Sequence, residues 1–133
     1  MMTTEQLQAK LNQLLALSSE TEYVEFKEAK RNFDFDDLGR YFSALCNEAN
    51  LKGQAYAWLV FGVQDFPRKI VGSHYRENRA DLDNLKHEIA QGTTGRITFT
   101  EIYELIVSGK RVILFQIPPA LLGMPVAWKG HHF

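Results

Sequence analysis

The sequence predicts an α+β fold, with a mixed, mostly antiparallel sheet of about five or six strands and three helices. Three stretches place apolar residues at the spacing of one helix face, and shorter apolar stretches typical of strands lie between and after them. The chain has 133 residues, which is the size of one domain that buries a core without disulfide bonds. No repeat or linker interrupts the pattern, so we expect a single domain over residues 1–133.

The N-terminal part of the chain predicts a helix, a strand and a second helix. The first helix lies within residues 1–17, where leucines recur at helical spacing after a capping residue, Thr3. Residues 23–27 alternate between apolar and polar side chains, as a half-buried strand does. The second helix is expected over residues 36–49, with the Asp34 or Asp36 carboxylate accepting from the free N–H groups at its start.

The rest of the chain predicts one helix and several strands. The order is a central strand buried on both faces, a short strand in a hairpin with it, a third helix, one or two strands, a returning strand and a last edge strand. These elements are expected at residues 55–63, 69–72, 79–91, 97–107, 112–117 and 124–128. The last residues look like the start of a hairpin without a return strand, so we expect further domains of a longer protein.

The cellular location is predicted from what the sequence lacks. Its one cysteine, Cys46, cannot form an intramolecular disulfide, and on its helix it is expected to be a buried, inert thiol. No signal peptide is evident, and the longest nearly apolar stretch, residues 55–63, is too short to cross a bilayer. We therefore expect a cytoplasmic protein that does not contact a membrane.

Five segments carry motifs in a recognisable order. They are Glu20–Glu28, Phe42–Asn47, Phe61–Asp65 together with Ile70–Gly72, Arg111–Pro118, and Pro125–Val126 together with Lys129–Gly130. In this order, residues 18–133 resemble the Alba-like (AlbA) domain of Schlafen proteins and of many bacterial transcriptional regulators. One departure is that only Gly53 stands where the family has a pair of glycines.

The resemblance implies a nucleic-acid-binding module of a bacterial transcriptional regulator, with DNA favoured over RNA and with no cofactor or catalysis. The formal net charge of −1 means that such binding needs a local basic patch. A protein-interaction or dimerisation module, such as a homodimer, is another alternative. A large exposed apolar patch without a basic groove would favour that alternative.

A second function implied by the resemblance is nucleic-acid cleavage, because some Schlafen proteins cleave structured RNA with three carboxylates. Glu20 and Glu25 have the spacing of the acidic pair in those members, and Asp65 follows the central strand. Three carboxylates would hold Mg²⁺ or Mn²⁺, and Lys27, on the strand face of Glu25, would stabilise developing charge. The alternative is a solvated Glu25–Lys27 pair and an Asp65 that only begins a turn.

Basic residues near expected hairpins and helix starts are candidates for phosphate contacts. They are Lys27, Lys30, Arg31, Arg68, Lys69, Arg76, Arg79, Lys110 and Arg111. Tyr41, Phe66 and Tyr75 would stack on bases if they are exposed. An ordinary solvated surface is the alternative, because 15 basic residues stand against 16 acidic ones. The four histidines lack the spacing of a zinc site and are expected at the surface; they are His74, His87, His131 and His132.

Overall fold

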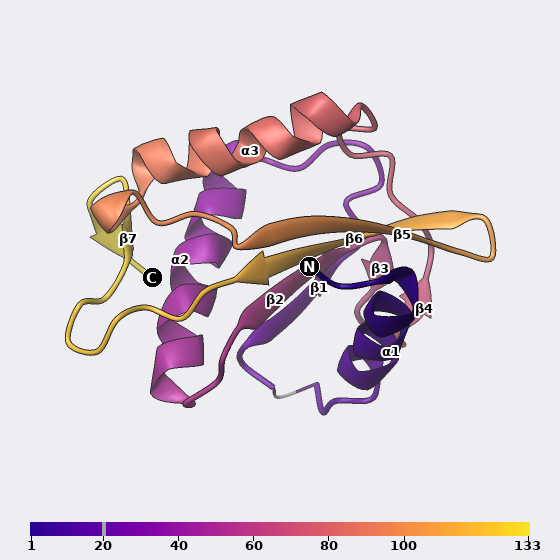
Figure 1. Ribbon diagram of the computed structural model, residues 1–133, viewed down its shortest axis with the longest axis horizontal. Helices are drawn as coiled ribbons and strands as arrows, with labels where there is room; N and C mark the ends of the chain where they lie inside the picture. Colours follow the sequence, from indigo (N-terminus) through magenta and orange to yellow (C-terminus); the bar gives the residue numbers. More distant parts are fainter. Residues whose placement is uncertain (20) are drawn as a thin grey trace.

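The computed structural model describes residues 1–19 and 21–133 and confirms the α+β class (Figure 1). The described residues form three α-helices, which are α1 (Thr4–Leu15), α2 (Phe35–Leu51) and α3 (Arg79–Gly92), and a short 3₁₀ turn at Thr94–Arg96. The strands are β1 (Val24–Lys27), β2 (Ala57–Phe61), β3 (Val63–Gln64), β4 (Lys69–Ile70), β5 (Glu101–Val107), β6 (Lys110–Ile117), β7 (Ala127–Trp128) and β8 (His131–His132).

The main sheet has the order β1-β2-β6-β5. Strand β1 runs parallel to β2, whereas β6 is antiparallel to both β2 and β5. The sheet is therefore mixed and mostly antiparallel, as the sequence predicts, but it has four strands rather than five or six. The short pairs β3–β4 and β7–β8 form two separate ribbons instead of joining it.

Gly62 explains why the chain leaves the sheet after β2. Its φ is +94°, a backbone conformation that L side chains rarely adopt, and a Cβ built there would lie 2.7 Å from the Arg111 carbonyl oxygen. Its N–H donates to the Lys27 carbonyl at 2.9 Å, which ties the ends of β1 and β2 together. The long strand expected over residues 55–63 is thus divided into β2 and β3.

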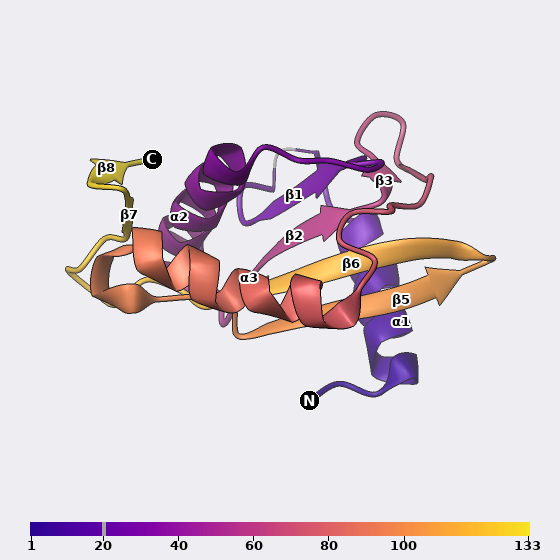
Figure 2. The same ribbon diagram turned by 90° about the horizontal axis from the view of Figure 1, so that it is seen from above.

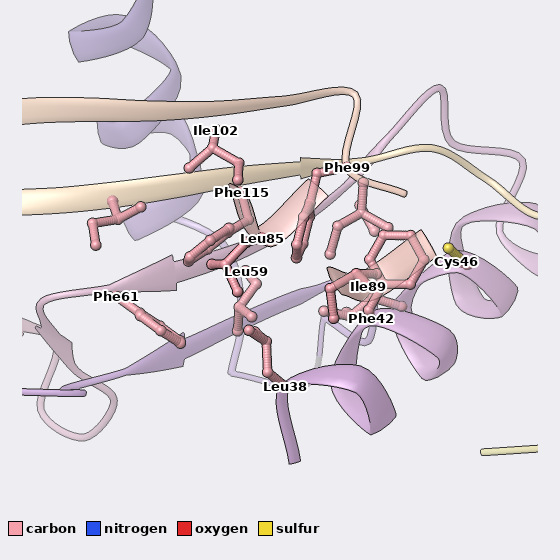
Figure 3. Close-up of a cluster of buried hydrophobic side chains, with 14 of the residues drawn as sticks. Leu38, Phe42, Cys46, Leu59, Phe61, Leu85, Ile89, Phe99, Ile102 and Phe115 are labelled. Carbon is pink, nitrogen blue, oxygen red and sulfur yellow. The ribbon is translucent and has the colours of Figure 1, made fainter. Parts of the chain in front are cut away.

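Helices cover both faces of the sheet (Figures 1 and 2). The first face packs against α2 and α3, and its core is shown in Figure 3. This core joins aromatic and aliphatic side chains of the sheet and both helices, including Leu59, Phe61, Phe115, Leu38, Phe42, Leu85 and Ile89. Cys46 also lies here, and burial raises the pKa of its thiol to about 12, so it is inert at neutral pH.

The second face of the sheet packs against α1. Leu7, Leu11 and Leu14 of this helix lie against apolar side chains of the sheet that include Phe26 and Trp58. Because β2 contributes side chains to both faces, all five of its residues are buried, as expected for the central strand. The capping box at Thr3 is present, although α1 ends at Leu15 rather than at residue 17.

Trp128 on β7 joins the two helices of the first face. Its indole occupies a slot made by Gly39 of α2 and Gly92 of α3, where a built Cβ would lie 2.0 Å and 2.4 Å from indole carbons. Its Nε1–H donates to Asp36 at 3.2 Å. His131–His132 pair back onto β7, so the hairpin has the return strand that the sequence does not predict.

Candidate functional site

Three segments meet at the end of the sheet where the parallel strands β1 and β2 finish. The Ser73 N–H donates to the Arg111 carbonyl at 2.8 Å, and the His74 N–H donates to the Lys30 carbonyl at 2.7 Å. The Lys110 ammonium lies 3.5 Å from the Ile70 carbonyl. These contacts bring residues 27–31, 69–74 and 110–111 together, and these segments carry most of the basic residues singled out from the sequence.

Arg68 is committed to the fold. Its guanidinium donates to the carbonyls of Leu14, Leu15 and Leu17 at the end of α1 and stacks on Phe26, with its Cζ 4.5 Å from the ring centroid. The last carbonyls of a helix have no partner within the helix, and a cation there is stabilising. Arg68 therefore fixes the β3–β4 ribbon to α1.

Arg111 is also committed to internal contacts. It donates to the carbonyls of Ser73, Tyr75 and Arg76 and to the Glu104 carboxylate at 2.7 Å, and its side chain is only 11% exposed. Burial opposes ionisation of Glu104, but hydrogen bonds from Arg111 and Arg79 outweigh it and lower the pKa of this carboxyl. Arg111 thus stabilises the segment that leads into α3.

Arg76 and Arg79 hold the start of α3 to its surroundings. Arg76 pairs with Glu88 at 2.5 Å, and Arg79 pairs with Glu104 at 3.1 Å. Together with Arg68 and Arg111, they account for four of the nine basic candidates, and all four have structural partners. The sequence does not single out Arg68, Arg79 and Arg111, because their carbonyl acceptors belong to segments that meet only in the fold.

Four of the remaining cations at this end of the sheet are exposed. Lys30 makes a 3.8 Å surface pair with Glu28, and Lys110 makes the long contact to Ile70. Within the described part of the chain, Arg31 and Lys69 have no side-chain hydrogen bond or ion pair. We name these four residues the basic edge: Lys30, Arg31, Lys69 and Lys110.

Glu25, Lys27 and Asp65 lie beside the basic edge. The Lys27 ammonium is 3.6 Å from a Glu25 oxygen and 4.8 Å from the centroid of the Tyr41 ring. Burial raises the pKa of Glu25; the charge of Lys27 opposes the rise, and the charge of Asp65 adds to it. The two carboxylates are therefore close enough to repel each other.

The third carboxylate of the expected metal site, Glu20, lies outside the described residues. Among residues 1–19 and 21–133, no group of three or more His, Cys, Asp or Glu side chains is arranged to hold a metal ion. Glu25 and Asp65 are therefore the two described members of the predicted set.

The aromatic candidates differ sharply in exposure. Tyr75 is buried at 5% exposure, Tyr41 is half-buried beneath Lys27, and Phe66 is 89% exposed at the tip of the β3–β4 ribbon. Of these three candidates, Phe66 is the one with an exposed ring. The four histidines lie at the surface, as expected from their spacing. None of the three helices in the described part of the chain has the length and apolarity needed to cross a membrane.

The fold and the basic edge define a class: a small α+β domain with helices on both faces of a mixed sheet and a cationic end. The chain belongs to the Schlafen AlbA_2 family, whose sequence profile matches residues 20–133. The resemblance seen in the sequence is thereby confirmed. No curated protein matches this chain in sequence.

Two solved structures have a similar fold. The crystal structure of the DIP2311 protein from Corynebacterium diphtheriae superposes with a TM-score of 0.58 at 19% identity and covers 94% of this chain. The solution NMR structure of an N-terminal domain from Nitrosomonas europaea has a TM-score of 0.59 at 21% identity and covers 92%. The chain spans 24% of the length of the first protein and 76% of the second.

Proposed function

We propose that this domain binds nucleic acid through the basic edge. The carrying observation is that Lys30, Arg31, Lys69 and Lys110 remain exposed on segments that meet at one end of the sheet, while the neighbouring arginines are used internally. Cations at hairpins and loops suit phosphate contacts, which position a protein without reading sequence. A local group of this kind is what a chain with a formal net charge of −1 needs in order to bind a polyanion.

DNA is the favoured partner within this proposal. The Nitrosomonas europaea protein is named for its relation to the ATP-dependent DNA helicase RecG, which supports a DNA target. The family resemblance supports a role as the DNA-binding module of a transcriptional regulator that has further domains. In a helicase-related protein or in a transcriptional regulator, the domain would supply affinity for DNA through phosphate contacts.

The salt dependence of binding tests the proposal. Replacing all four residues of the basic edge by glutamine is expected to reduce the slope of log K against log salt by about 3–4 units on duplex DNA, and to weaken binding at low salt by about 100-fold. Fluorescence anisotropy with a labelled duplex at several salt concentrations measures both quantities. Failure of the wild-type domain to bind DNA or RNA at low salt would refute the proposal.

A matched control removes the same number of charges elsewhere. Lys10, Lys52, Lys86 and Lys129 lie outside the basic edge, and the last three make surface ion pairs with Glu22, Glu101 and Asp36. Replacing these four lysines by glutamine changes the net charge equally, and we expect little change in the slope. An equal loss of binding in both variants would show that net charge acts rather than the basic edge.

A second candidate function is metal-dependent cleavage of RNA or DNA. The observation that favours it is the arrangement of Glu25 on β1, with its carboxylate 3.6 Å from the Lys27 ammonium and within reach of the Asp65 charge. A divalent cation would relieve the repulsion between the two carboxylates, and hard cations prefer oxygen ligands. Glu25 and Asp65 would therefore hold Mg²⁺ or Mn²⁺. When bound, such an ion supplies charge stabilisation and an activated water for phosphodiester hydrolysis. Lys27 would orient the Glu25 carboxylate and attract a substrate phosphate.

Cleavage assays with transfer RNA and Mn²⁺ test the second function. If it is correct, Glu25→Gln is expected to lower the cleavage rate by about 100-fold or more, because a ligand and its charge are lost. Glu28→Gln is the control, since this exposed carboxylate is close in sequence and, among residues 1–19 and 21–133, its ion pair is with Lys30. Equal cleavage by the wild type and Glu25→Gln would eliminate this function.

A further inference from the structure

Phe66 is a large apolar side chain that is exposed to solvent. The ring is 89% exposed at the tip of the β3–β4 ribbon, in the loop between Gln64 and Lys69. The other two aromatic candidates, Tyr41 and Tyr75, are partly and fully buried. An exposed ring of this size gains free energy from any partner that removes it from water.

The loop that carries Phe66 is fastened at its base. The Gln64 side chain donates to the carbonyls of Phe66 and Pro67 at 3.2 Å and 3.1 Å. Arg68, two residues beyond Phe66, is bound to the end of α1 and to the Phe26 ring. The ring is therefore presented by an ordered turn, so little conformational entropy is lost when a partner binds it.

The surroundings of Phe66 indicate the chemistry of its partner. Lys69 follows it in the same ribbon, and Lys110 contacts the ribbon at the Ile70 carbonyl. An exposed ring on a ribbon that also carries or contacts cations suits a ligand with flat apolar faces and a negative backbone, which is the combination found in single-stranded nucleic acid. In an intact duplex the bases are already stacked on one another, so their faces are not available to the ring.

We propose that Phe66 is a stacking platform for an unpaired base, so that the domain prefers single-stranded or locally opened DNA to intact duplex. This inference rests on the proposed function, because the basic edge must hold the backbone for the base to reach the ring. Stacking on an aromatic side chain tolerates any base, so the preference concerns strand state and not sequence.

Binding of oligothymidylate and of a duplex of equal length tests the inference. Phe66→Ala is expected to weaken single-strand binding by about 5-fold to 100-fold and duplex binding by much less. The control is Leu122→Ala in the loop between β6 and β7, at the other end of the molecule from the β3–β4 ribbon (Figure 1). Leu122 is 92% exposed, so it matches Phe66 as an apolar surface residue, and its loss is expected to leave both affinities unchanged.

A second variant gives a direct signal of stacking. The two native tryptophans, Trp58 and Trp128, are 4% and 2% exposed, so the indole introduced by Phe66→Trp would be the exposed one. Its emission is expected to be quenched when oligothymidylate binds, because a stacked base lies against the indole. Thermal unfolding of each variant checks that the fold is retained.

Each outcome separates this inference from the proposed function. If the wild type binds neither oligonucleotide, the proposed function fails and the inference falls with it. If binding is salt-dependent but Phe66→Ala matches the wild type on single strands, or emission of the bound Phe66→Trp variant is unchanged, only the inference is overturned. The inference is also overturned if Phe66→Ala weakens binding to the single strand and to the duplex equally. It is overturned as well if the wild type is a dimer and Phe66→Ala is a monomer, because the ring would then contact a second copy of the chain.

Discussion

Replacing Trp128 by alanine is expected to lower the free energy of unfolding by about 3–5 kcal/mol. The indole is 2% exposed and fills the slot between α2 and α3, where Gly39 and Gly92 leave no room for a Cβ. Its removal would leave a cavity lined by two helix backbones and would free Asp36 from the indole N–H. Urea denaturation followed by circular dichroism measures the loss.

Two further variants separate the packing of the indole from the surface ion pair beside it. Lys129→Ala removes an exposed neighbour that pairs with Asp36, and it is expected to cost less than about 1 kcal/mol. Gly39→Ala adds a methyl group where a built Cβ lies 2.0 Å from the indole, so it is expected to destabilise by about 1–3 kcal/mol through overpacking. Wild-type stability in both Trp128→Ala and Gly39→Ala would contradict this account of the slot.

Arg111→Ala is expected to destabilise the domain by about 3 kcal/mol or more. The substitution leaves the carbonyls of Ser73, Tyr75 and Arg76 without their donor and removes one partner of Glu104. Arg111→Lys is expected to restore only part of the stability, because one ammonium cannot replace a planar group with five donors. Lys110→Ala, at the exposed neighbouring position, is the control and is expected to leave stability nearly unchanged.

The pH dependence of stability provides a second measurement on Arg111→Ala. The pKa of Glu104 is lowered in the folded protein, so its contribution is present above the unfolded pKa and is lost as the pH falls through the folded pKa. Without Arg111 this pKa rises toward its ordinary value, so the variant is expected to lose less stability on acidification. Unchanged stability together with weaker DNA binding would instead assign Arg111 to phosphate contact.

The sequence predicts the fold class well because the elements carry strong local signals. The leucine spacing of α1 with its capping Thr3, and the apolar run of β2, depend on neighbouring residues alone, and both are confirmed. The division of residues 55–63 is not predictable in this way. It depends on Gly62 lying close to the carbonyl of Arg111, which is 49 positions away in the sequence. The return strand β8 is missed because a two-residue strand has almost no pattern.

The candidate site is harder to predict from the sequence than the fold is. Basic residues near turns are easily found, but a sequence does not reveal which of them face carbonyl groups. Arg68 meets the end of α1, and this contact spans about 50 residues of chain. The solvent exposure of a side chain is equally difficult to predict from the sequence. Tyr75 and Phe66 are both candidates for base stacking, but Tyr75 is buried in the fold and Phe66 is exposed. The roles of Glu25, Asp65 and the basic edge remain predictions.

The helix α1 shows that a family boundary and a folding boundary differ in this chain. The family profile begins at residue 20, after the helix has ended. Yet Leu7, Leu11 and Leu14 cover the second face of the sheet, and Arg68 from within the family region holds the end of the helix. A fragment cut at the boundary of homology would expose that sheet face, including Trp58, to water. The unit that excludes water from its own core is thus larger than the stretch that the family profile matches.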